Sequence, residues 1–220
     1  SLETLNIGPA VQSINSYAFS NCAKLEEINF SDSVTSIGDY AFENCASLAS
    51  LTIPGNVRTI SVGAFYGCSG LKTLNLNEGI TTIKGQAFMN CPITTLVIPD
   101  SVTSMPSYEY YSSGYKYHGA FEGCKNLTSV IIGNGLTTID TETFQSCSAL
   151  STLVIGDTVS SIGTNAFNNC TGLTSIKMGS NLHTIGSYAF SNCSSFVFIA
   201  VTASSKAADI LYPYKGTRKP

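Results

Sequence analysis

Residues 48–68 read LASLTIPGNVRTISVGAFYGC, and this stretch recurs with substitutions along almost the whole chain. Eight cysteines mark the repeat: every interval between them equals the step from Cys45 to Cys68, except the longer step from Cys91 to Cys124. A fixed period of about 23 residues is typical of stacked repeat architectures. A phenylalanine precedes each cysteine by three positions. The marker residues are Cys22, Cys45, Cys68, Cys91, Cys124, Cys147, Cys170 and Cys193, with Phe19, Phe42, Phe65, Phe88, Phe121, Phe144, Phe167 and Phe190.

Each unit follows the pattern L-x-x-L-x-I, V-x-x-I, A-F-x-x-C. In the unit quoted above, Leu51 to Ile53 alternate between apolar and polar residues, which predicts a short strand with one buried face. Pro54 and Gly55 supply turn residues directly after it. The β-branched V-x-x-I block predicts a second extended segment, and A-F-x-x-C a tight helical or 3₁₀ turn. The units begin at Leu2, Leu25, Leu48, Leu71, Ile93, Leu127, Leu150 and Leu173, with an incomplete ninth at Phe196.

A repeat solenoid is the fold that these units predict. One unit cannot bury its apolar residues alone, but stacked units bury a continuous column. About six side chains per unit enter that column, each contributing roughly 1.5–3 kcal/mol when buried. We therefore expect about eight such units, built from short parallel strands and turns, over residues 1–201. Residues 202–220 leave the pattern and predict a C-terminal cap and tail, with a short helix at 207–211.

The composition excludes some function classes and favours an exported protein. Only 11% of residues are charged and the net charge is −3, so a nucleic-acid partner is not expected. Ser and Thr make up roughly a quarter of the chain, which suits an extracellular or cell-surface protein. No apolar run approaches the roughly 18 residues that span a bilayer. The chain begins inside a repeat, so we expect a fragment whose export signal and N-terminal cap lie outside it.

The repeat resembles the BspA-type leucine-rich repeat of secreted and surface proteins from bacteria and some protozoa. The likeness covers residues 2–201. It implies a leucine-rich-repeat arc or horseshoe, adhesion to host proteins or surfaces, a bacterial source and no enzymatic activity. One clean example of the motif is Leu150-Ser-Thr-Leu153-Val-Ile155, Val159-Ser-Ser-Ile162-Gly163 and Ala166-Phe167-Asn-Asn-Cys170.

The cysteines predict a ladder of free, buried thiols. Equivalent cysteines on adjacent units point the same way at about the 4.8 Å strand spacing, whereas a disulfide prefers Cβ atoms about 3.8 Å apart. Thiolates in a straight line cannot form the tetrahedron that zinc requires. A free cysteine packs as a small apolar group, so we expect these residues to be structural.

Candidate catalytic groups are sparse. His118 and His183 are the two histidines, and His183 occupies a polar position where a solvated side chain is expected. None of the common nucleophile, metalloprotease or nucleotide-binding motifs occurs. The carboxylates are scattered, with Glu26, Glu27 and Asp32 nearest to a cluster. We therefore expect no enzymatic activity, no cofactor and no metal.

The long interval between Cys91 and Cys124 contains an insertion of eleven residues between Met105 and Ala120. Tyr and Ser/Gly together are typical of recognition loops, because tyrosine gives contact area with few rotors to order. Two interpretations remain open: a ligand-contacting loop, or a protruding hairpin with its turn at 112–114 that packs back on the solenoid. The insertion spans residues 106–119, and its candidate binding residues are Tyr108, Tyr110, Tyr111, Tyr115, Tyr117 and His118.

A second break in the pattern lies on the outward face of the first strand. Three consecutive units place Val97, Ile131 and Val154 there, where the first four units carry Asn or Thr. Contiguous exposed apolar residues can mark an interaction site, although β-branched residues also simply favour strands. Together the two breaks predict a protein-binding or adhesion module. A carbohydrate-binding surface module using the same tyrosines, and a structural spacer for a missing domain, are the alternatives.

Overall fold

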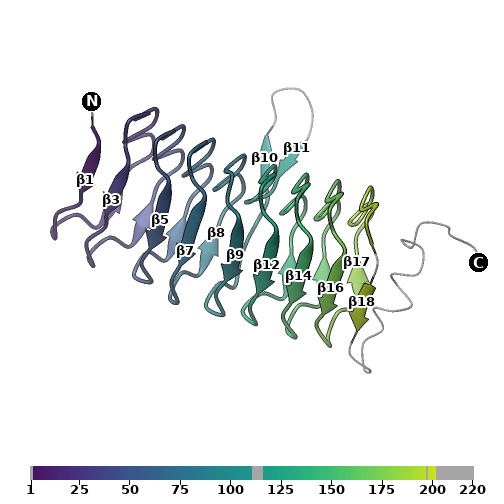
Figure 1. The fold of residues 1–220 in the computed structure, drawn as a ribbon. Coiled ribbons are helices and arrows are strands. Elements are labelled where there is room, and N and C mark those ends of the chain that lie inside the picture. The colour runs from purple at the N-terminus through teal and green to yellow at the C-terminus, as the bar shows by residue number, and fades with distance from the viewer. Residues whose placement is uncertain (1, 111–115, 197, 202–220) are drawn as a thin grey trace, which may run out of the picture.

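The computed structural model describes residues 2–110, 116–196 and 198–201, with the backbone alone described for 108–110, 116–117 and 198–201. Each unit forms one coil of a solenoid, and the coils stack side by side along one axis (Figure 1). The first strand of each coil comes from the L-x-x-L-x-I block. These strands are β1 Thr4–Asn6, β3 Glu27–Asn29, β5 Ser50–Ile53, β7 Thr73–Leu76, β9 Thr95–Ile98, β12 Ser129–Ile132, β14 Thr152–Ile155, β16 Ser175–Met178 and β18 Phe198–Val201.

The V-x-x-I block forms a second, two-residue strand on the other side of the coil, which confirms the expected extended segment. These strands pair in parallel with their equivalents in neighbouring units, as β2-β4-β6-β8 and as β13-β15-β17. Within the described residues there is no helix. The second strands are β2 Ser13–Ile14, β4 Ser36–Ile37, β6 Thr59–Ile60, β8 Thr82–Ile83, β13 Thr138–Ile139, β15 Ser161–Ile162 and β17 Thr184–Ile185.

The register of the first strands shows how the solenoid accommodates the insertion. Leu51 pairs with Leu74, its equivalent one period later, and Val97 pairs with Ile131 in the same way although the insertion separates them in sequence. The extra residues lie between the V-x-x-I block of unit five, which forms only an isolated bridge at Ser104, and its A-F-x-x-C turn, so they leave the coil and return to it. The first strands on both sides of the insertion, β9 and β12, therefore pair as β12 and β14 do.

The core is a column of apolar side chains that runs the length of the solenoid. Its centre is a stack of phenylalanine rings, of which Phe42, Phe65, Phe88, Phe121, Phe144 and Phe167 are fully buried. Neighbouring rings in this stack lie 5.1–5.5 Å apart between centroids and within 7° of parallel. Each ring contributes a large buried area, and the stack continues across the insertion because Phe88 and Phe121 are 5.3 Å apart.

The A-F-x-x-C segment is a pair of hydrogen-bonded turns, which refines the expected helical or 3₁₀ turn. In most units the residues two before and two after the phenylalanine adopt a left-handed backbone, for example Tyr40 with φ 55° and Asn44 with φ 57°. A left-handed residue interrupts a right-handed helix. The amide of Phe42 instead donates to the carbonyl of Ala64 in the next coil at 2.8 Å, so these turns are held by their neighbours in the stack.

The eight cysteines are free, and seven are buried while Cys22 is half-buried. Each thiol from Cys45 onward donates a hydrogen bond to the phenylalanine carbonyl of the preceding coil, at 3.1–3.4 Å. Each of these carbonyls also accepts the amide of the cysteine in its own coil, as the carbonyl of Phe42 does from Cys45 at 3.4 Å. The cysteine of the next coil is therefore a small residue whose thiol gives this buried carbonyl a second hydrogen bond.

Hydroxyl side chains perform a similar task at the edges of the coil. Thr128 donates to the carbonyl of Thr94 at 2.9 Å, and Ser151 donates to the carbonyl of Thr128 at 3.0 Å. On the second side, Ser160 donates to the carbonyl of Thr137 in the same way. Part of the Ser and Thr content thus follows from the fold.

The insertion forms a β-hairpin that projects beyond the row of A-F-x-x-C turns (Figure 1). Its strands are β10 Tyr108–Tyr110 and β11 Lys116–His118, paired antiparallel with Tyr108 opposite His118. The predicted turn at 112–114, together with Tyr111 and Tyr115, lies outside the described residues, as does the predicted cap at 202–220.

Candidate functional site

Val97, Ile131 and Val154, here called the apolar strip, lie side by side on the outward face of β9, β12 and β14. Ile131 is the register partner of both Val97 and Val154. Val97 and Ile131 are 57% and 44% exposed, whereas Val154 is half-buried. Lys177 follows on β16 as the partner of Val154, so a cation borders the strip.

The equivalent positions in the first four units are polar and bond to one another. The Asn29 side-chain amide donates to Asn6 Oδ1 at 3.0 Å, and that of Asn75 donates to Thr52 Oγ1 at 3.2 Å. The outward sheet face therefore changes from a self-paired polar ladder to an apolar surface at the coil from which the hairpin emerges.

The base of the hairpin is held to the solenoid by polar contacts. The amide of Ser107 donates to Asp140 Oδ2 at 3.3 Å, and the amide of Gln86 donates to the carbonyl of Gly119 at 3.0 Å. Gly119 is needed for the close approach of the next coil, because a Cβ there would collide with the backbone of Glu142. These contacts fix the point at which the hairpin leaves the coil.

The sequence predicts that His118, the last residue of β11, contacts a partner at the surface, but the structure places it differently. Its side chain is buried, with 8% of the residue exposed, and its Nδ1 lies 2.7 Å from Glu122 Oε2. Because this side chain points into the hairpin base, we place it among the supporting residues. The tyrosines of the insertion are placed by backbone only at Tyr108, Tyr110 and Tyr117.

His118 belongs to a cluster that sequence reasoning missed. Glu122 is 7% exposed and Glu142 is half-buried. One ligand-type atom from each of His118, Glu122 and Glu142 lies within 4.8 Å of the other two. Both carboxylates also accept hydrogen bonds from amide side chains: Gln145 Nε2 donates to Glu122 Oε1 at 3.4 Å, and Asn165 Nδ2 donates to Glu142 Oε1 at 3.5 Å.

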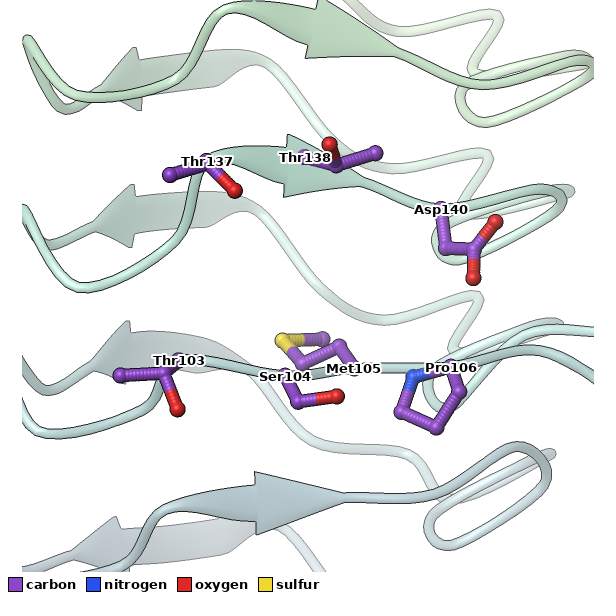
Figure 2. A pocket seen from close by; sticks show the side chains of 7 residues that line it. All are labelled: Thr103, Ser104, Met105, Pro106, Thr137, Thr138 and Asp140. Carbon is purple, nitrogen blue, oxygen red and sulfur yellow. The ribbon is translucent and has the colours of Figure 1, made fainter.

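A small pocket lies where the second sheet is interrupted. Ser104 forms one isolated bridge with Thr82 and no strand with β13, and the gap between the two coils is visible in Figure 2. The pocket has a volume of about 110 Å³. Ligand sites usually measure about 300–1,000 Å³, so this space suits a few water molecules. It is lined by Thr103, Ser104, Met105, Pro106, Thr137, Thr138 and Asp140.

The thiols are poorly suited to nucleophilic chemistry. Burial raises the pKa of the Cys124 thiol to about 12 and that of Cys193 to about 12. Since the thiolate is the reactive form, such thiols are inert near neutral pH. His183, the other histidine, is exposed and has its Nδ1 2.7 Å from the carbonyl of Asn181.

Stacked two-strand coils with an inward Leu/Ile/Val/Phe column define a leucine-rich-repeat scaffold. The BspA type leucine rich repeat region matches residues 1–116 and 117–209 in six copies. The chain therefore belongs to the BspA-type leucine-rich-repeat family. No helix of sufficient length and apolarity to cross a membrane occurs among the residues with a described placement.

A solved structure has the same kind of fold, and a second is similar in sequence. A leucine-rich repeat protein from Bacteroides ovatus is 24% identical with a TM-score of 0.55, over 93% of this chain and 70% of that one. A leucine rich cell surface protein from Faecalibacterium prausnitzii is 21% identical with a TM-score of 0.36, over 98% and 83% of the two chains. The first supports the fold, and the second is too distant to add an argument. None of the curated proteins matches the chain.

Proposed function

We propose that this chain is a non-enzymatic recognition module of a secreted or cell-surface bacterial protein. The leucine-rich repeats act as the scaffold, and the tyrosine hairpin at 106–119 and the apolar strip contact a protein partner. The observation that carries this proposal is the exposed register pair Val97 and Ile131, 57% and 44% exposed, on the coils that flank the hairpin.

The structural role of the repeat residues supports this assignment. Phenylalanine stacking, thiol bonds and hydroxyl bonds continue across unit five, and these scaffold contacts involve neither the hairpin nor the side chain at position 131. Adjacent exposed apolar side chains lose solvent contact when a partner binds, which favours association. Tyrosines add amphipathic contact area at low cost in side-chain entropy.

The strip can be tested by the double substitution Val97→Thr and Ile131→Thr, which keeps β-branched side chains on exposed strand positions. We expect at least a tenfold weaker affinity for a partner found in a panel of extracellular-matrix proteins, with an unchanged melting temperature. Asn75→Thr, at the same outward position on β7, is the matched control and is expected to bind as the intact chain does. Equal affinity of the double variant and the intact chain would remove the strip from the proposed surface.

A further inference from the structure

We infer that His118, Glu122 and Glu142 bind one divalent transition-metal ion, with Zn²⁺ as the preferred ion, at the base of the hairpin. This inference is independent of the proposed recognition role. It starts from the cluster geometry: one ligand-type atom from each residue lies within 4.8 Å of the others, and His118 and Glu122 are 8% and 7% exposed.

The donor set suits such an ion. Imidazole nitrogen and carboxylate oxygen bind Zn²⁺ at about 2.0–2.2 Å, which places tetrahedral ligands about 3.4 Å apart. The distance from His118 Nδ1 to Glu122 Oε2 is 2.7 Å, which is shorter than this ligand spacing. The ligand-type atoms of the cluster lie within 4.8 Å of one another, a limit that is longer than this spacing. Small side-chain rotations reach the required spacing. Three protein ligands leave a fourth position for water.

The charges of the cluster favour a cation. Two carboxylates and one imidazole meet in a mostly buried place. Carboxylates attract cations, and this attraction is stronger where water is partly excluded. A divalent ion bound by a neutral imidazole and two carboxylates makes the set neutral overall.

Amide side chains of the next coils support both carboxylates. Gln145 donates to the Glu122 oxygen that does not face His118, and Asn165 donates to Glu142. Hydrogen bonds of this kind orient metal ligands and are a usual part of metal sites. His118, Glu122 and Glu142 would thus be the metal ligands, and Gln145 and Asn165 would orient the two carboxylates.

The same positions in other units do not form this set. Glu43 occupies the position of Glu122 in unit two, but there it accepts a hydrogen bond from Ser20 at 3.1 Å, and Asp39 stands where unit five has His118. The combination of His118, Glu122 and Glu142 occurs where the hairpin returns to the coil. An ion there would join the end of β11 to the turns of units five and six.

The test is calorimetric titration of the reduced full-length chain with Zn²⁺, and then with Co²⁺ observed by absorption. We expect one ion per chain and a cobalt spectrum without a thiolate charge-transfer band, because the ligands are nitrogen and oxygen. Each of His118→Gln, Glu122→Gln and Glu142→Gln should weaken binding at least about tenfold, the loss that follows removal of even a supporting group. Glu43→Gln and His183→Gln are the matched controls and should bind as the intact chain does.

Three results would overturn the inference. They are no stoichiometric binding, a thiolate band in the cobalt spectrum, or binding that the three cluster variants leave unchanged. Circular dichroism of each variant tests whether it is folded, which separates a loss of binding from a loss of structure. None of these results bears on partner binding by the hairpin tyrosines, which is measured separately.

Discussion

The thiol of Cys124 donates a hydrogen bond to the carbonyl of Phe88 at 3.2 Å, across 36 residues of chain. In every other coil with this bond the two residues are 26 apart, as for Cys147 and Phe121 at 3.3 Å. Eleven inserted residues and one residue lost after Cys91 give the ten extra positions, and they change neither the contact nor its length. The insertion therefore leaves the column of phenylalanine and cysteine side chains unaltered, although it interrupts the second sheet between β8 and β13.

Selective thiol reactivity is the first expected consequence of the ladder. Cys22 is half-buried, whereas the other seven cysteines are buried. Since alkylation requires access as well as the thiolate, iodoacetamide should modify Cys22 first and the others only on unfolding. Peptide mass spectrometry of the native protein over time measures this order. Simultaneous labelling of Cys22 and Cys124 in the folded protein would contradict the described burial.

The ladder also predicts loss of stability in alkali. Burial raises the pKa of Cys124 from 9.0 to about 12. The folded state therefore keeps its proton while the unfolded state loses it, so the stabilising contribution is complete below pH 9 and is lost as pH rises towards 12. The slope is about −1.4 kcal/mol per pH unit for one such thiol.

Comparing the intact chain with Cys124→Ala isolates this effect. The substitution removes a titrating group, so the free energy of unfolding should fall less steeply between pH 9 and pH 12, by about 1.4 kcal/mol per pH unit. Urea unfolding under reducing conditions at several pH values gives both slopes. The cavity left by Cys124→Ala lowers the free energy of unfolding by the same amount at every pH, so it does not affect the slope. Equal slopes for the intact chain and the variant would contradict the raised pKa of Cys124.

Gly119 is expected to be sensitive to substitution. A Cβ at this position would meet the backbone of Glu142 and Thr143, which cannot move without shifting the next coil. Gly119→Ala should lower the free energy of unfolding by about 1–3 kcal/mol, the usual cost of overpacking. Gly8→Ala is the matched control, because no atom lies within 4 Å of its added Cβ, and it should unfold like the intact chain.

The regular part of the fold could be predicted because the repeat period determines where each strand lies in the sequence and which strand it pairs with. The repeat spacing places Leu51 beside Leu74 and Phe42 beside Phe65, and the structure has both pairs. The turns were less predictable, because a left-handed Tyr40 depends on hydrogen bonds to the next coil.

The cluster at the hairpin base could not be predicted from spacing alone. His118 and Glu142 belong to consecutive units, and their meeting depends on the direction of side chains at the two ends of a turn. The sequence does contain one indication of the cluster: His118 and Glu122 are four positions apart, with Gly119 between them. The apolar strip, by contrast, follows directly from the register, since Val97 and Ile131 occupy equivalent positions.

Deleting residues 107–117 gives the most direct measurement of the recognition role. The deletion leaves Pro106, His118 and Gly119 between Met105 and Ala120, the same number of residues that separate Ile60 from Ala64. Affinities of the intact and deleted chains are compared on an extracellular-matrix protein panel and a glycan array, with melting temperature as the folding control. The deleted chain should have the melting temperature of the intact one and bind its protein partner at least tenfold more weakly. Unchanged protein binding after deletion, hairpin-dependent binding to glycans instead of proteins, or binding by neither chain would contradict the recognition role.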